Sequence, residues 1–298
     1  MTTSSVRPPA WLVTGATGQL GTDLQRVLAG QHVTALGRAQ LDLTDEQQVR
    51  GTVRAWRDGV LARGGYPVVL NAAAYTAVDA AETDEGTAHR VNGLAPGWLA
   101  QELAGAGRLV HVSTDYVFAG DGTRPYRVDD EPAPRSAYGR TKLAGERAVL
   151  AAGGDALVVR TSWVYAAHGA NFVRTMLRLQ AERDTVSVVA DQTGSPTWSL
   201  DLARGLVQAA GAPVRGVLHA TDAGATTWHG LARLVFALAG ADPERVLPVT
   251  TAEFPRPAPR PAYSVLDPAG WAAAGLTPLP GWERSVRGCL AELGALPT

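Results

Sequence analysis

A glycine-rich turn close to the N-terminus restricts the fold more than any other segment of the sequence. An apolar run at residues 11–14 leads into Gly-Ala-Thr-Gly-Gln-Leu-Gly at residues 15–21, and a helical pattern continues to about residue 28. Glycine lets the backbone approach a pyrophosphate, whose charge is attracted by the helix N-terminus. This order predicts a dinucleotide site; the alternative is a tight turn that binds no ligand. The expected contacts are Gly15, Thr17, Gly18, Gln19, Leu20 and Gly21.

Apolar segments and helical patterns alternate along the first half of the chain. Further strands are expected at 32–36, 67–71, 109–113 and 157–160, with helices between them at about 44–53, 84–104 and 138–152. Continuous apolar strands that alternate with helices are typical of a parallel sheet covered on both faces. The predicted fold is therefore α/β, a Rossmann-type doubly wound parallel sheet.

The second half of the chain has a looser pattern. We expect helices at about 170–182, 199–210 and 282–293, strands at 186–189 and 216–219, and proline-rich loops over 248–280. Residues 1–162 are expected to form the cofactor-binding domain, with its sheet completed by parts of 184–222. Residues 163–298 are expected to form mainly a smaller C-terminal substrate-binding lobe, interleaved with the first domain.

Composition excludes several classes of partner. The 298 residues include 27 basic and 28 acidic side chains, so neither nucleic acid nor another polyanion is expected to bind. One cysteine, Cys289, cannot form an intramolecular disulfide or a cysteine-based metal cluster. No apolar run reaches the roughly 20 residues that span a membrane, and residues 1–10 lack the apolar core of a signal peptide. No membrane partner is expected, and the cytoplasm is the expected location.

The ends of the second and third strands bear on the choice of cofactor. The second ends in Ala-Leu-Gly-Arg38, without Asp or Glu, and an arginine there accommodates the 2′-phosphate of NADPH. The alternatives are a solvated surface arginine and NADH as cofactor. Asp42 and Leu43 follow and are expected to border the adenine. The third strand ends in Ala72, Ala73 and Ala74, whose small side chains either leave room for a flat cofactor or allow tight helix packing.

Tyr138 and Lys142 are four residues apart in a helical segment, so both side chains lie on one face of that helix. An ammonium group beside a phenol favours the phenolate, so we expect Lys142 to lower the pKa of Tyr138 towards neutrality. Such a phenol is suited to donate a proton to a carbonyl that is being reduced. The pair alone is weak evidence, because the same spacing occurs on many exposed helical faces.

These segments, in this order, resemble the extended short-chain dehydrogenases/reductases and, more closely, the dTDP-4-dehydrorhamnose reductase family. The resemblance covers nearly the full length and is carried by residues 15–21, 71–79, 112–118, 138–142, 160–165, 171–173, 191–197 and 260–261. It implies reduction of the C4 ketone of dTDP-4-dehydro-L-rhamnose to dTDP-L-rhamnose by hydride transfer from NADPH. The alternatives are a 4-ketoreductase for another dTDP-deoxysugar and, from a different class, a non-catalytic cofactor-binding regulatory subunit.

The resemblance implies a catalytic set of Thr114, Tyr138 and Lys142. Tyr138 would donate its proton to the sugar oxygen, Lys142 would also bind the cofactor ribose, and Thr114 would orient the carbonyl. The alternative for Thr114 is a strand-end side chain that caps local backbone. By the same resemblance, Tyr75 and Thr76 contact the cofactor.

The implied substrate contacts are Val78, Thr114, Asp115, Tyr116, Trp163, Asn171 and Arg260. The pair Asp115-Tyr116 argues for simple reduction, because related dehydratases carry Asp-Glu there and use both groups to eliminate water. Core packing is the alternative for Trp163, capping of its own helix for Asn171, and a surface position for Arg260.

The resemblance also implies, for some family members, a dimer formed around a magnesium ion held by glutamates. The corresponding position here is Asp23, and Glu292 is a second candidate. No full set of ligands is evident, so no metal is expected, and a homodimer is left open.

Overall fold

The computed structural model describes residues 7–297, so the signal-peptide prediction for residues 1–10 lies largely outside the described residues. Its centre is a six-stranded sheet, in which every strand pairs in parallel, in the order β10-β5-β4-β3-β1-β2. The strands are β1 (Pro9–Thr14), β2 (Val33–Leu36), β3 (Tyr66–Asn71), β4 (Arg108–Thr114), β5 (Asp155–Thr161) and β10 (Gly216–His219). The predicted α/β fold with a parallel sheet is confirmed.

The strand order creates a switch point beside β1. The chain passes from β1 to β2 on one side, then returns past β1 to place β3 on the other side. At such a point the loops after neighbouring strands diverge, and ligands bind in the crevice at the carboxyl ends of the strands. The glycine turn follows β1 and Ala72 follows β3, so both lie at this crevice.

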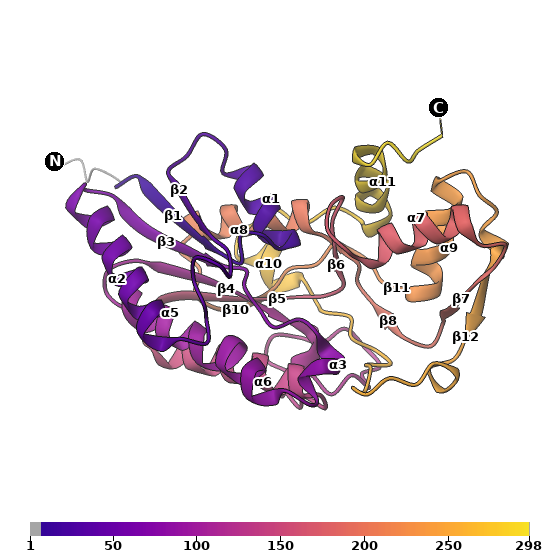
Figure 1. Cartoon of the computed structure of the whole chain (residues 1–298), viewed down its shortest axis with the longest axis horizontal. Coiled ribbons are helices and arrows are strands. Elements are labelled where there is room, and N and C mark those ends of the chain that lie inside the picture. The colour runs from indigo at the N-terminus through magenta and orange to yellow at the C-terminus, as the bar shows by residue number, and fades with distance from the viewer. Residues whose placement is uncertain (1–6, 298) are drawn as a thin grey trace.

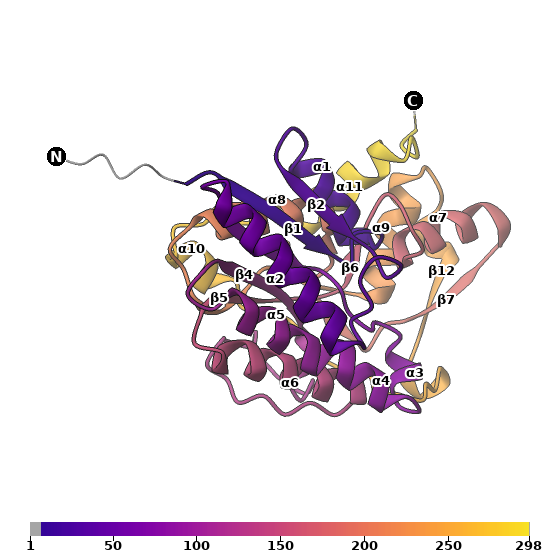
Figure 2. The same ribbon diagram turned by 60° about the vertical axis from the view of Figure 1, so that its left-hand side comes forward.

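Helices cover both faces of the sheet (Figure 1). One face carries α1 (Gln19–Val27), α8 (Ser199–Gly211) and the short α10 (Ala269–Ala273). The opposite face carries α2 (Glu46–Ala62), α5 (Ala95–Leu103) and α6 (Ala137–Ala151), which lie side by side in Figure 2. The strands alternate accordingly, since Trp11 and Val13 pack in the α1 and α8 core while Leu12 packs in the α2 and α5 core.

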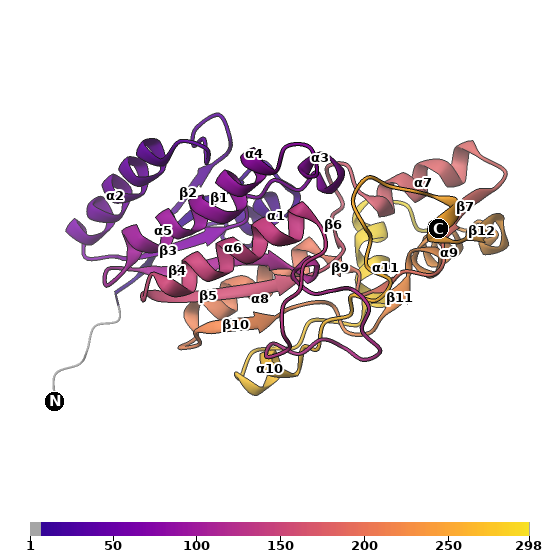
Figure 3. The same ribbon diagram turned by 90° about the horizontal axis from the view of Figure 1, so that it is seen from below.

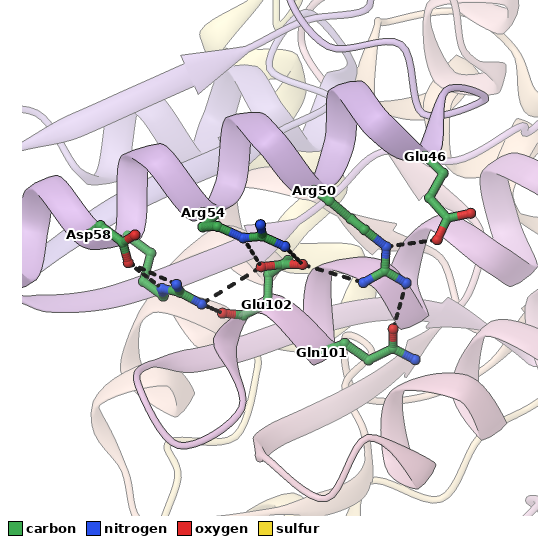
Figure 4. A network of polar contacts seen from close by, with 7 residues as sticks. Glu46, Arg50, Arg54, Asp58, Gln101 and Glu102 are labelled. Atoms are coloured by element: carbon green, nitrogen blue, oxygen red, sulfur yellow. Dashed lines mark hydrogen bonds and ion pairs between the residues drawn. The ribbon is translucent and has the colours of Figure 1, made fainter.

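An ion-pair network joins α2 to α5 at the surface (Figure 4). The Glu102 carboxylate accepts from Arg54 Nε at 3.1 Å and Nη2 at 3.0 Å, and from Arg50 Nη1 at 3.4 Å. Arg50 also donates to Gln101 at 2.7 Å. Because water screens much of this network, it specifies the register of the two helices more than it stabilises them.

The prediction of one continuous helix over residues 84–104 is wrong in one respect. This segment consists of α4 (Glu85–His89), a π-helical turn η1 (Arg90–Leu94) and α5, and it is preceded by a single turn, α3 (Val78–Ala81). Within η1, Asn92 accepts from the backbone N–H of Tyr75 at 2.8 Å and donates to Thr141 Oγ1 at 3.2 Å. The π-helical turn therefore brings the loop after β3 and helix α6 together.

A second lobe lies beyond the carboxyl ends of the strands (Figures 1 and 3). Its helices are α7 (Phe172–Glu182), α9 (Trp228–Leu238) and α11 (Trp282–Glu292), and β7 (Val186–Val189) pairs in parallel with β12 (Val246–Val249). Short pairs join β6 (Val164–Tyr165) to β9 (Thr197–Trp198) and β8 (Thr193–Gly194) to β11 (Thr226–Thr227). Strand 186–189 thus belongs to this lobe, whereas 216–219 joins the main sheet.

The segment after β12 returns to the main sheet. It passes the 3-10 turn η4 (Thr251–Glu253); two further 3-10 turns are η2 (Asp115–Val117) and η3 (Pro243–Arg245). Tyr263 N donates to Gly120 O at 2.9 Å, and Ser264 N donates to Thr193 O at 2.8 Å. The chain here connects the two lobes by backbone hydrogen bonds. Between residues 7 and 297, no helix combines the length and the apolar character that crossing a membrane requires.

Candidate active site

The glycine turn is packed so closely that larger residues do not fit. Gly15 has a φ of +69°, and a Cβ there would lie 2.7 Å from Ala73 Cα. A Cβ on Gly21 would lie 2.1 Å from Gly15 O. Gly18 is the N-cap of α1, and no side chain caps that helix. Backbone N–H groups at the start of α1 therefore face the crevice, an arrangement that fits the pyrophosphate of a dinucleotide.

The residues after β2 differ in what they offer a ligand. Arg38 is exposed and next to the glycine turn, because Gly37 approaches Thr17. Asp42 accepts from Thr44 N at 2.9 Å and Thr44 Oγ1 at 2.8 Å, and these bonds lower its pKa. Leu43 is buried in the core beneath α2. Thus Arg38 is free to meet a phosphate, whereas Asp42 and Leu43 have structural contacts of their own.

Ala72, Ala73, Ala74 and Tyr75 are half-buried along the loop after β3, and Thr76 is exposed. The close approach of Ala73 to Gly15 shows that this loop packs tightly against the glycine turn. Small side chains are therefore needed here for packing, and they also leave the crevice open.

Thr114, Tyr138 and Lys142 come together where β4 ends. Thr114 and Lys142 are buried, and Tyr138 is half-buried. Thr114 lies close enough to Tyr138 to lower the pKa of its phenol, and Lys142 Nζ donates to Val112 O at 2.7 Å. Helix α6 can approach the turn that follows β4 because residue 139 is glycine: a Cβ there would lie 2.2 Å from Tyr116 O. Thr114 also accepts from Tyr116 N at 3.3 Å, so its capping alternative coexists with the contact to Tyr138.

The pKa of Tyr138 differs from the sequence prediction. Burial raises the pKa to about 12, hydrogen bonding to Thr114 opposes that rise, and the charge of Asp115 adds to it. Lys142 is not among the causes, because its ammonium group is directed to the Val112 carbonyl. The prediction that Lys142 lowers this pKa is wrong for this structure. Tyr138 is protonated at neutral pH, as a proton donor must be.

Lys142 and Asp115 are the other shifted groups of the site. Burial lowers the pKa of Lys142 to about 8, and Glu146 opposes this shift. Burial raises the pKa of Asp115 to about 6, and the nearby Ser264 and Thr114 side chains oppose this rise. Asp115 Oδ1 accepts from Thr114 Oγ1 at 2.9 Å, whereas Oδ2 has no partner among residues 7–297. One buried carboxylate oxygen is therefore free to accept from a ligand hydroxyl.

Tyr116 and Arg260 lie beside the same cluster. The ring of Tyr116 meets the ring of Tyr138 edge-on, with centroids 5.5 Å apart. Arg260 Nη2 donates to Asp79 at 2.8 Å, next to Val78 on α3. Tyr116 and Arg260 both line a small hollow on the surface. Arg260 is therefore anchored near the site and not placed at random in a surface loop.

Trp163 has the one positive φ, +46°, among the non-glycine residues of 7–297. Its indole stacks on Trp228, with centroids 3.7 Å apart and an interplanar angle of 8°. A Cβ on Gly194 would lie 2.4 Å from the indole. The half-buried ring is thus held between two segments of the second lobe, and its backbone strain is consistent with a fixed functional position.

Asn171 and the two candidate metal ligands have partners within the chain. Asn171 caps α7 through Arg174 N at 3.1 Å and donates to Gln19 Oε1 at 3.0 Å, so its helix-capping alternative is confirmed. Arg26 Nη1 donates to Asp23 at 2.8 Å and to Glu292 at 2.7 Å. These carboxylates are therefore neutralised by an arginine.

The comparisons with known proteins cover almost the whole chain. Residues 10–295 match the family model of the RmlD substrate binding domain. The dTDP-4-dehydrorhamnose reductase of Streptomyces griseus is 50% identical, over 93% of this chain and 92% of the relative. A probable dTDP-4,6-dihydroxy-2-methyloxan-3-one 4-ketoreductase of Streptomyces antibioticus is also 50% identical, over 95% of each chain.

Solved structures agree with this likeness. The dTDP-4-dehydrorhamnose reductase of Bacillus anthracis, in complex with NADP, has a TM-score of 0.89 and 35% identity, covering 96% of this chain and 99% of that one. The chain therefore belongs to the dTDP-4-dehydrorhamnose reductase family of extended short-chain dehydrogenases/reductases.

Proposed function

We propose that this protein reduces the C4 ketone of dTDP-4-dehydro-L-rhamnose to dTDP-L-rhamnose with NADPH, with Tyr138 as the proton donor. The observation that carries the proposal is the cluster of half-buried Tyr138 with buried Thr114 and Lys142 beside the glycine-lined crevice. Relatives at 50% identity that are named for this reaction support the substrate.

The proposed chemistry uses each member of the cluster differently. When bound, NADPH supplies the hydride that reaches C4 of the sugar. Tyr138, protonated because burial raises its pKa to about 12, donates its proton to the C4 oxygen. Thr114 orients the carbonyl by a hydrogen bond, and the ammonium group of Lys142 would bind the cofactor ribose. A hydroxyl and an ammonium held in a buried site act without reorganising solvent.

The proposed cofactor contacts belong to the crevice at the switch point. The glycine turn and the start of α1 hold the pyrophosphate, and Arg38 holds the 2′-phosphate, which favours NADPH over NADH. A bound NADP in the structural relative from Bacillus anthracis supports this choice. Residues 1–162, with the strand at 216–219, are proposed as the cofactor-binding domain, and residues 163–298 as mainly the substrate-binding lobe.

The proposed substrate contacts are Asp115, Tyr116, Val78, Trp163 and Arg260. Asp115 Oδ2 accepts from a sugar hydroxyl, and Arg260 binds the diphosphate by charge-assisted hydrogen bonds. Asn171 contributes by fixing Gln19 at the glycine turn. The cytoplasm is the proposed location, and a homodimer is the assembly to test by sedimentation.

A second candidate is reduction of another dTDP-4-ketosugar. The relative from Streptomyces antibioticus, as similar as the rhamnose reductases and named for a different ketosugar, favours it. A substrate panel separates the two: NADPH oxidation is followed at the nicotinamide absorbance with dTDP-4-dehydro-L-rhamnose and with other dTDP-4-ketosugars. If only another ketosugar is turned over, the proposed substrate is rejected, whereas the proposed ketone reduction by NADPH is retained.

The catalytic role has its own test in Tyr138→Phe. The phenylalanine keeps the ring packing on Tyr116 but has no proton to donate, so we expect turnover to fall by about 10²–10⁴-fold. NADPH binding, followed by quenching of protein fluorescence, should be unchanged. Full activity in this variant would contradict the proposed proton donor, and absence of activity in the unaltered protein would favour the regulatory-subunit alternative.

A further inference from the structure

A buried ion pair lies one helical turn beyond Lys142 and is not used by the proposed chemistry. Glu146, on α6, is 2% exposed, and Arg160, at the end of β5, is 3% exposed. Arg160 Nε donates to Glu146 Oε1 at 2.9 Å and Nη2 donates to Oε2 at 2.7 Å. Ser113 Oγ, from β4, donates to Oε1 at 2.5 Å. Three elements thus meet at one carboxylate.

The pair is poorly explained by stability. Removing two charges from water costs about as much as their attraction returns, so buried pairs are weak sources of stability. Its place relative to the site is more informative. Ser113 precedes Thr114 in β4, and positions four residues apart on α6 put Glu146 on the same face as Lys142. The pair therefore joins two elements that carry the catalytic cluster.

Lys142 is the single lysine among the 27 basic residues of the chain. Unlike arginine, a lysine loses its charge readily when it is buried. Burial does lower the pKa of Lys142, and Glu146 is the group that opposes this. Two ionisable neighbours of Lys142 carry no charge at neutral pH: Tyr138 on α6 is protonated, and burial and the charge of Lys142 lower the pKa of His111 on β4, so this imidazole adds no like charge.

We propose that Glu146 and Arg160 are positioning residues for Lys142: the carboxylate of Glu146 keeps the ammonium group charged, and Arg160 and Ser113 hold that carboxylate in place. Glu146 touches neither substrate nor cofactor in this assignment and acts only through the lysine. The inference rests on the proposed function for what the lysine does, although the charge of Lys142 can be measured without catalysis.

The test uses the fact that one lysine gives one signal. Protein labelled with ¹³C at lysine Cε is titrated by NMR, and its single lysine resonance reports Lys142 directly. In the unaltered protein the midpoint should lie at about 8. In Glu146→Gln, which leaves Arg160 uncompensated, we expect the midpoint to fall by about one unit. In the double variant with Arg160→Gln as well, part of this fall should be recovered.

A matched control is available on the same helix. Arg140, also on α6, forms an exposed ion pair with Glu85 at 2.7 Å. Glu85→Gln removes the exposed carboxylate on α4 that pairs with Arg140 of α6, and the lysine midpoint should not move. Fold is checked in every variant by the dispersion of the methyl resonances. A folded Glu146→Gln protein with the original midpoint overturns the inference.

Turnover provides the second measurement. If the charged lysine is needed, a midpoint lowered by about one unit reduces kcat by about fivefold at pH 8 and by about twofold at pH 7. The alkaline limb of the kcat profile should shift by as much as the NMR midpoint. A shifted midpoint in a protein that reduces no ketosugar would reject the proposed function alone. An unshifted midpoint in an active enzyme would reject the role of Glu146 alone.

Discussion

The cofactor side and the substrate side of the site are built in different ways. On the cofactor side, Gly15 and Ala73 lie in loops that leave neighbouring parallel strands, and Gly21 lies in the first turn of α1. A Cβ on either glycine would lie within 2.7 Å of neighbouring backbone atoms. On the substrate side, side chains are held by distant segments: Trp163 by Trp228, and Arg260 by Asp79.

This difference determines which substitutions each side of the site can accept. A backbone contact cannot be replaced by another residue type, so the cofactor side admits glycine alone at its closest positions. A side-chain contact can be weakened in steps, so the substrate side can change its ligand while the cofactor site persists. Relatives named for different ketosugars at similar identity fit this division.

The largest expected effect on ligand affinity comes from Gly21→Ala on the cofactor side. The new Cβ would lie 2.1 Å from Gly15 O, so the turn has to move away from its pyrophosphate-binding geometry. We expect NADPH affinity, measured by calorimetry, to fall at least about tenfold, equivalent to roughly 1.4 kcal/mol. Gly51→Ala is the matched control, because this helical glycine has open space around it. Equal NADPH affinity in the two variants would contradict the strict requirement for glycine on the cofactor side.

Asp115 lies between the two sides and yields a prediction about pH. Burial raises its pKa to about 6, above the value of about 3.9 in an unfolded chain. The folded state therefore keeps a proton that the unfolded state has lost, and stability falls as pH rises through this window. Asparagine does not titrate, so Asp115→Asn does not lose stability in this way. The free energy of unfolding of the variant, relative to that of the unaltered protein, should therefore rise by on the order of 2 kcal/mol between about pH 4 and about pH 7.

Urea unfolding at several pH values measures this gain as the difference between the two proteins. Asp129→Asn, which changes an exposed carboxylate, is the control and should show a difference that does not vary with pH. A pH-independent difference for Asp115→Asn would mean that Asp115 is ionised throughout and that its surroundings are more polar than the buried position indicates.

The sequence predicted best what depends on short spacings. The glycine turn and the pair Tyr138 and Lys142 are each defined within seven residues, and the structure has both elements where they were expected. The parallel sheet followed from continuous apolar strands. Tertiary effects were missed: the π-helical turn at Arg90–Leu94 depends on contacts of Asn92 with the loop after β3 and with α6, which no local pattern encodes.

Predictions on the substrate side needed distances in space. Trp228 and Asp79 hold Trp163 and Arg260 from far along the chain, so neither was singled out as a partner. The pKa of Tyr138 was predicted in the wrong direction because residue spacing indicates the nearby charge but not the burial, which is the larger cause here. Helix α9 and strand β12 were likewise not assigned, although β7, the partner of β12, was.

The smallest expected effect is on the substrate side, in Trp228→Leu. Leucine fills much of the space behind Trp163 but cannot stack on its indole, so the ring that faces the proposed sugar site loses its support. A stacked aromatic pair contributes about 0.5–1.5 kcal/mol, so the KM for the nucleotide sugar should rise by about two- to tenfold. NADPH affinity, measured on the same preparation by calorimetry, serves as the internal control and should be unchanged, because the aromatic rings that pack on Trp228 are those of Trp163 and Phe172 in the second lobe. If the NADPH affinity falls together with the affinity for the nucleotide sugar, the cofactor side and the substrate side are coupled and do not vary independently.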